Sequence, residues 1–156
     1  MSDTNTGEKM KYSVIVNAVI ANQEGKILLI QRGFQEEHGP GTWSIPGGKL
    51  EFSGIVYEAL QKTAVKEAME ETGVEIEEEM QLIANNTFQH NEDALQVIAM
   101  VFLCRYKSGE PKPLEDTADV RWIGLGEVDN FEFHNVNVKN YVLKGFELLK
   151  RSRDRI

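Results

Sequence analysis

One segment, residues 57–72, limits the possible folds more than any other part of the sequence. It contains no Pro or Gly and consists mainly of Ala, Leu, Gln, Lys, Glu and Met, which lose little side-chain freedom on entering a helix. Gly73 follows directly and is a typical residue for the end of a helix. Because segments with strand patterns lie on both sides of this helix, the sequence predicts an α/β fold.

The flanking segments supply the rest of the secondary structure. Turn-forming residues at 22–25 separate two apolar stretches and predict a β-hairpin, whereas residues 33–41 have the composition of a surface loop. Apolar residues at helical spacing predict a last helix over 136–150. The remaining strands are expected at residues 12–20, 27–30, 43–45, 82–88, 94–106 and 120–123. The resulting order is strands, helix, strands, helix, without internal repeats.

Length and charge exclude several classes of protein. A chain of 156 residues forms one typical domain, here expected at 12–156 after a flexible leader at 1–11. A formal net charge of −8 disfavours binding to a nucleic-acid backbone. No stretch is apolar enough to span a membrane, and the single cysteine, Cys104, lies in an apolar run as a buried thiol would. We expect a cytoplasmic protein, with neither nucleic acid nor a membrane as its partner and with a homodimer left open.

The predicted central helix carries an unusual group of acidic residues. Glu67, Glu70 and Glu71 stand at i, i+3 and i+4, so their carboxylates share one face. Each like-charge pair costs only about 0.2 to 0.5 kcal/mol, which a solvated helix tolerates. Grouped carboxylates also suit Mg²⁺ or Mn²⁺, which favour oxygen ligands and commonly bridge to substrate phosphates. Both interpretations remain open on the helix alone.

The segment before the helix adds a second feature. Pro46, Gly47 and Gly48 follow a short strand and allow the main chain to approach a ligand closely. Taken together, residues 43–51 (WSIPGGKLE) and 66–74 (KEAMEETGV) resemble the signature of the Nudix hydrolases, and in particular the MutT-type members.

The family signature runs Gly, five residues, Glu, seven residues, Arg-Glu, an apolar residue, any residue, Glu-Glu, any residue, Gly and an apolar residue. The second half is matched almost completely, and seven residues separate Glu58 from Lys66 as the pattern requires. Two departures stand out. Lys66 replaces the usual Arg, and nine residues instead of five separate Gly48 from Glu58, so the loop at 52–57 carries a four-residue insertion.

The resemblance implies a fold and a site. The fold is the Nudix α/β/α sandwich, with a mixed sheet and the loop-helix-loop of the signature. The site holds Mg²⁺ (or Mn²⁺) through Glu67, Glu70, Glu71 and the main chain of Gly48. By resemblance, Lys66 orients Glu67 through an ion pair, although an ordinary solvated lysine is the alternative.

A general base is expected either among these glutamates or in a distal loop. Glu115 and Asp116 are the local candidates, and Asp116 is included in the predicted catalytic set. Two acids in a polar loop are also common as solubilising charge.

Candidate substrate contacts come from one basic and three aromatic residues. Arg32 ends a predicted strand and suits a phosphate, or it is a surface arginine at a strand end. A nucleobase could stack on Trp43, Phe34 or Phe88, although most aromatic residues belong to the core. Phe131, Phe133, Trp122 and Phe146 are assigned to packing.

Three functions are compatible with the sequence. The first is hydrolysis of a nucleoside triphosphate to a nucleoside monophosphate and pyrophosphate. The second is hydrolysis of ADP-ribose, a nucleotide sugar or a dinucleoside polyphosphate. The third is a nucleotide-binding module with the Nudix fold that no longer catalyses, which the altered signature would explain. The presence of all three glutamates favours an enzyme.

Overall fold

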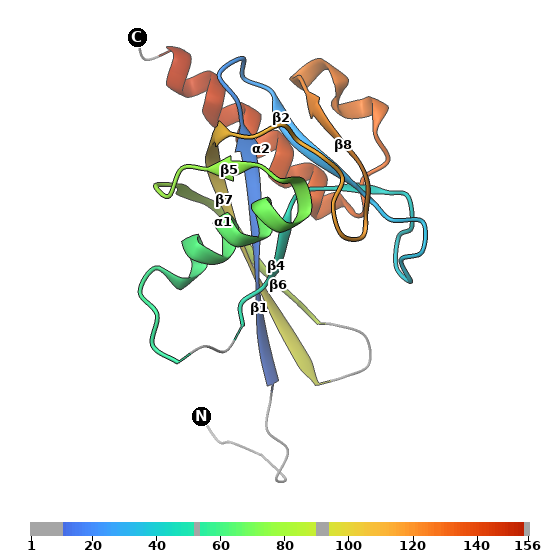
Figure 1. The fold of residues 1–156 in the computed structure, drawn as a ribbon, viewed down its shortest axis with the longest axis vertical. Helices are drawn as coiled ribbons and strands as arrows, with labels where there is room; N and C mark the ends of the chain where they lie inside the picture. The colour runs from blue at the N-terminus through green and yellow to red at the C-terminus, as the bar shows by residue number, and fades with distance from the viewer. Residues whose placement is uncertain (1–10, 52–53, 90–93, 155–156) are drawn as a thin grey trace.

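The computed structural model describes residues 11–51, 54–89 and 94–154. The strands and helices follow the order expected from the sequence (Figure 1). In chain order they are β1 (Lys11–Ala21), β2 (Ile27–Arg32), β3 (Trp43–Ser44), β4 (Gly47–Lys49), α1 (Ala59–Thr72), β5 (Glu75–Ile76), β6 (Gln81–Gln89), β7 (Leu95–Ser108), β8 (Thr117–Ile123), the 3-10 helix η1 (Leu125–Asn130) and α2 (Val136–Asp154).

The strands form one mixed sheet built around a parallel pair. β1 and β7 run parallel from the pair Lys11 and Leu95 to the pair Ala21 and Arg105. β2 and β4 pair antiparallel with β1, while β5 and β6 pair antiparallel with β7. β2 in turn carries β3 and β8. Within the described residues this gives an eight-stranded sheet.

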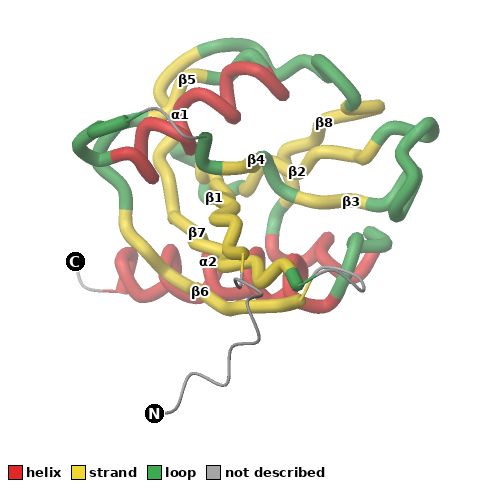
Figure 2. The backbone as a smooth tube through the Cα atoms, turned by 90° about the horizontal axis from the view of Figure 1, so that it is seen from below, coloured by secondary structure: helices red, strands yellow, loops and turns green. Residues whose placement is uncertain are grey.

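The two α-helices cover opposite faces of this sheet, as Figure 2 shows with α1 on one side and α2 on the other. β1 supplies both faces because neighbouring side chains of a strand point in opposite directions. Val16, Ala18 and Ile20 join the core under α1, whereas Val19 and Ala21 join the core under α2. β1 is therefore buried on both sides, and the expected α/β/α sandwich is confirmed.

Several element boundaries differ from the expectation by a few residues. β4, β5 and η1 were not expected, because each is too short to show a periodic pattern. Cys104 is fully buried as predicted, and burial raises the pKa of its thiol to about 12. The proposed leader lies outside the described residues except for Lys11, which already belongs to β1. In the described part of the chain, no helix is long and apolar enough to cross a membrane.

The close approach of α2 to the sheet depends on Gly145, and this yields the first prediction. A Cβ atom at this position would lie 2.7 Å from Cγ1 of Val19. Helix propensity alone predicts that Gly145→Ala stabilises the fold by about 1 kcal/mol, but overpacking typically costs about 1 to 3 kcal/mol. We expect a net loss of about 1 kcal/mol in the free energy of unfolding, measured by urea denaturation. Gly126→Ala is the control, because no atom lies within 4 Å of its added Cβ, and stabilisation by Gly145→Ala would contradict the packing argument.

Candidate functional site

The site begins where β4 lies against β1. Gly48 pairs with Val16, and Gly47 pairs with Asn17. A Cβ atom on Gly47 would come within 2.5 Å of the carbonyl oxygen of Val16, so only glycine permits this strand pairing without displacement. The turn-like sequence Pro46 to Gly48 is thus used to place main chain close to its neighbours.

The last two turns of α1 face this strand. The backbone N–H of Gly47 donates a hydrogen bond of 3.0 Å to Oε1 of Glu71. A Cβ atom on Gly48 would lie 2.7 Å from Oε2 of Glu67, so the Glu67 carboxyl group packs directly on the glycine backbone. The two glycines and the two glutamates form a single contact between strand and helix.

The two glutamate carboxyl groups are electrostatically unfavourable in this position. Burial raises the pKa of Glu71 to about 8, against the opposing effect of the Gly47 N–H. Burial also raises the pKa of Glu67, with a further contribution from the charge of Glu70. Each of the two carboxyl groups also shifts the pKa of the other, so they lie close together at the contact with β4, and burying both as carboxylates is unfavourable. A cation between them would offset this cost.

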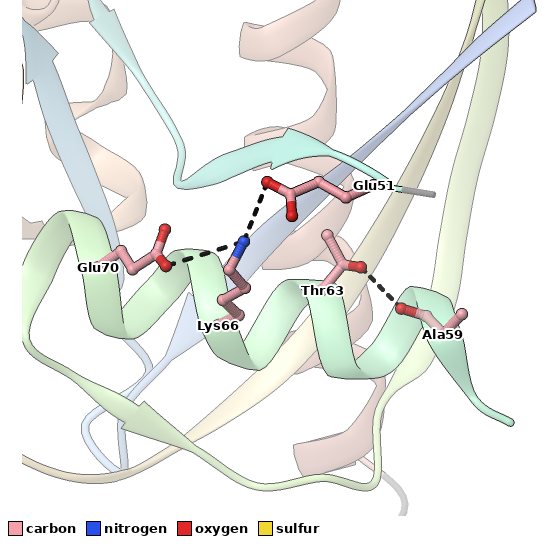
Figure 3. Close-up of polar contacts among 5 residues, drawn as sticks. All are labelled: Glu51, Ala59, Thr63, Lys66 and Glu70. Carbon is pink, nitrogen blue, oxygen red and sulfur yellow. Dashed lines mark hydrogen bonds and ion pairs between the residues drawn. The ribbon is translucent and has the colours of Figure 1, made fainter. Parts of the chain in front are cut away.

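Glu70 faces a different partner. Figure 3 shows the Lys66 amino group between Glu70 and Glu51, with Nζ 3.3 Å from Oε1 of Glu51 and 3.8 Å from Oε1 of Glu70. The hydrogen bond to Glu51 is the main cause that raises the pKa of Lys66. Within the described residues Lys66 forms ion pairs with Glu51 and Glu70 and not with Glu67, although its charge lowers the pKa of Glu67. Its orienting role toward Glu67 stays a prediction.

The three glutamates are consequently not gathered around one point. Among residues 11–51, 54–89 and 94–154, no group of three or more His, Cys, Asp or Glu side chains is arranged to hold a metal ion. Glu67 and Glu71 are in contact, whereas Glu70 is drawn toward Lys66 by a long and partly exposed ion pair. Such a pair contributes about 0 to 1 kcal/mol, so a ligand can displace it.

The loop between β7 and β8 is tied to the same end of α1. The backbone N–H groups of Lys112 and Leu114 donate to the carbonyl oxygens of Thr72 and Glu71, at 2.8 and 3.1 Å. These bonds satisfy two of the carbonyl groups that a helix leaves without partners at its C-terminus. The next residue, Glu115, has a left-handed backbone with φ of 53°, and its charge contributes to the raised pKa of both Glu67 and Glu71.

Asp116 has a different environment from Glu115. Its backbone carbonyl accepts a hydrogen bond of 2.8 Å from the N–H of Gly33, and its side chain is exposed. It is not among the groups that shift the pKa of Glu67 or Glu71. Of the two acids, Glu115 thus has the stronger electrostatic effect on Glu67 and Glu71, and the catalytic role of Asp116 stays a prediction.

The predicted substrate residues are scattered around the sheet. Arg32 holds the 33–41 loop through a 3.0 Å hydrogen bond from Nε to the His38 carbonyl and an ion pair with Glu36. Phe34 is 70% exposed, and its ring lies over Gly41. Their substrate roles remain predictions.

Trp43 and Phe88 also have structural surroundings of their own. Trp43 packs edge to face on Phe131 with ring centroids 5.0 Å apart, and the Arg121 guanidinium lies 5.8 Å from its ring. Phe88 is a partly exposed residue of β6 and pairs with Val97 of β7. Neither aromatic residue is in contact with the glutamates through any interaction in the described part of the chain.

Sequence reasoning overlooked Glu51, which stands 15 residues from its partner Lys66. A partial signal existed, because Lys66 and Glu70 stand at i and i+4, a spacing at which opposite charges pair on a helix. That pairing already competes with the expected one to Glu67.

Comparisons with known proteins agree with this geometry. Residues 11–143 match the model of the NUDIX domain. A MutT-like protein from Streptomyces ambofaciens is 30% identical over 118 residues, covering 75% of this chain and 67% of that protein. Two solved structures share the fold at 24% identity. A MutT protein from Methanosarcina mazei Go1 has a TM-score of 0.69 and covers 94% of this chain and 99% of its own. An ADP-ribose pyrophosphatase from Streptococcus suis has a TM-score of 0.64, with 87% and 90% covered.

The family match spans both faces of the sheet and includes β4, α1 and the loop that carries Glu115. Three of the residues that the family signature specifies, Gly48, Glu67 and Glu71, lie at the contact between β4 and α1. The chain therefore belongs to the Nudix family of pyrophosphohydrolases.

Proposed function

We propose that the protein hydrolyses a phosphoanhydride bond of a nucleoside triphosphate in the presence of Mg²⁺ or Mn²⁺, releasing a nucleoside monophosphate and pyrophosphate. The observation that carries this proposal is the pair formed by Glu67 and Glu71. The two neighbouring carboxyl groups are at least partly buried, and burial raises the pKa of both, so holding them as carboxylates costs stability unless a cation binds there.

The donor set fits a hard divalent ion. Mg²⁺ is usually held by one or two carboxylates and substrate phosphates while it keeps several waters. Glu67 and Glu71 would supply the carboxylates, Glu70 would join them on leaving Lys66, and the main chain of Gly48 lies against Glu67. When bound, the ion would polarise the phosphoryl oxygens and lower the pKa of a bound water.

The protein itself would orient the metal-binding carboxylate and accept a proton. The Gly47 N–H fixes the Glu71 carboxyl group, which keeps its oxygens oriented without help from solvent. Glu115 is exposed and is held next to this pair by the backbone bonds of its loop. It is a candidate to accept the proton of the attacking water, in preference to Asp116.

A second candidate is cleavage of ADP-ribose or a related compound. It is supported by the likeness of the fold to the ADP-ribose pyrophosphatase from Streptococcus suis. A binding module without catalysis is the third candidate, and its support is Lys66 at the position of the family's Arg. A cytoplasmic location, a homodimer and single-domain organisation over 12–156 remain predictions.

A nucleotide screen separates these candidates. The purified chain is incubated with nucleoside triphosphates, ADP-ribose, nucleotide sugars and dinucleoside polyphosphates, each with Mg²⁺, and the products are resolved by chromatography. The proposal expects fastest release of a nucleoside monophosphate and pyrophosphate from a triphosphate. Faster cleavage of ADP-ribose would establish the second candidate, and no turnover with any compound would favour the third.

Replacing Glu71 tests the site itself. Glu71→Gln keeps an acceptor for the Gly47 N–H but loses the charge, so we expect turnover to fall at least about a hundredfold with the fold intact. Circular dichroism and kcat are measured on one preparation. Glu79→Gln changes an exposed glutamate outside the site and serves as the control. Near wild-type turnover in Glu71→Gln would remove Glu71 from the site.

Thermal unfolding tests for the cation without any turnover. A ligand that binds only the folded protein raises its stability by RT ln(1 + [L]/Kd). Millimolar Mg²⁺ should therefore raise the Tm of the wild type more than the Tm of Glu71→Gln.

Without a divalent ion, in EDTA, the variant should be the more stable of the two proteins. At pH 7 in EDTA, Glu71→Gln should melt about 2 to 4 °C above the wild type. Burial raises the pKa of Glu71 to about 8, so the wild type must take up a proton to fold at this pH, whereas the amide needs none. An equal Mg²⁺ effect on both proteins would contradict a metal site at Glu71.

A further inference from the structure

A groove runs along the N-terminal half of α1, on the side that faces β4 and the residues that follow it. Its volume is about 230 Å³, and its lining includes Lys49, Glu51, Val56, Lys62, Thr63 and Lys66. Pockets that enclose a whole drug-sized ligand usually measure about 300 to 1,000 Å³. The groove is therefore the right size for part of a nucleotide.

The lining has an excess of positive charge. Lys49, Lys62 and Lys66 face a single acidic residue, Glu51, although the protein as a whole has a net charge of −8. Lys66 is engaged by Glu51 and Glu70. For Lys49 and Lys62, no carboxylate within the described residues comes close enough to form an ion pair. Two ammonium groups of the groove are thus available to an anion.

The groove is continuous with the glutamate site through Lys66. Lys62, Lys66 and Glu70 follow one another at intervals of four residues, so they lie on the same face of α1. Lys66 lines the groove and also pairs with Glu70 at 3.8 Å. Figure 3 shows Thr63 and Lys66 on the side of α1 turned toward Glu51. A ligand held at the glutamates can therefore extend along the helix into the groove.

We infer that this groove binds the phosphate groups of the substrate that extend beyond the glutamate site, so that Lys62 and Lys49 select for substrates with additional phosphate charge. This inference rests on the proposed function. Lysines are common phosphate ligands that act as point charges, and an acidic protein needs such local cations to hold an anionic substrate.

Glu51 has a defined place in this arrangement. Its carboxylate forms an ion pair with the Lys66 amino group at 3.3 Å. The Glu51 side chain is 73% exposed and the Lys66 side chain 45% exposed. Such a pair is weak, whereas a phosphate group carries more charge than a carboxylate. Phosphate therefore displaces Glu51 from Lys66, and Glu51 weakens phosphate binding by competing for the same cation.

One residue of the loop that distinguishes this chain from the family signature, Val56, lies in the groove lining. Val56 is 38% exposed, so it adds an apolar surface beside the lysines. The loop between Gly48 and Glu58 therefore contributes at least one side chain to the groove.

The test uses inorganic pyrophosphate and the full chain in EDTA, with calorimetry as the readout. Without a divalent ion the glutamates repel pyrophosphate, so binding reports on the lysines alone. We expect Lys62→Gln to bind about fivefold to tenfold more weakly and Glu51→Gln about fivefold more tightly than the wild type, changes typical of one charge at close range. Lys26→Gln, at the hairpin turn beyond the far end of β1, should bind as the wild type does.

The results separate this inference from the proposed function. Undetectable binding of pyrophosphate to the wild type, or equal binding by the wild type, Lys62→Gln and Glu51→Gln, would overturn the phosphate groove. The expected pattern in a protein that cleaves none of the screened nucleotides would support the groove and refute the hydrolase. Circular dichroism of each variant verifies that the fold is retained.

Discussion

The contact between the Gly47 N–H and the Glu71 carboxyl group is the interaction on which the site depends. It joins the sheet to α1 at one point, and it is possible only because the backbone of Gly47 can approach β1 without a side chain in the way. Ala64 and Ala68 allow α1 to lie close to the sheet, because their small side chains are fully buried between the two. The loop before β8 then attaches to the end of the helix and brings Glu115 near the pair.

The sequence was sufficient to predict the fold, whereas the roles of the site residues stay predictions. Long elements with clear periodicity, such as α1 and β7, were expected within two or three residues of their observed bounds. The spacing of Glu67 and Glu71 also placed them together, because residues four apart on a helix are neighbours. β4 was missed because its three residues have the composition of a turn, and only its pairing with β1 makes it a strand.

The partners of long side chains were harder to predict. Lys66 reaches Glu51 and Glu70 instead of Glu67, and the difference between such surface pairs is a fraction of a kcal/mol. A pattern on the helix cannot rank partners that arrive from another element. The same reason applies to Glu115 and Asp116. They are adjacent in the sequence, but the left-handed backbone of Glu115 and the hydrogen bond of the Asp116 carbonyl to Gly33 give them different environments.

The distribution of charge along α1 supports a role in binding instead of stability. A helix dipole favours acidic residues in the first turn and basic residues in the last, each by about 0.3 to 1 kcal/mol. α1 has no acidic residue in its first turn and no basic residue in its last. Instead Lys62 lies near its start, and Glu70 and Glu71 lie near its end. Stability alone would select against this arrangement. Substrate binding would favour this arrangement, because the glutamates near the end of α1 can hold a metal ion and the lysine near its start can bind a phosphate group.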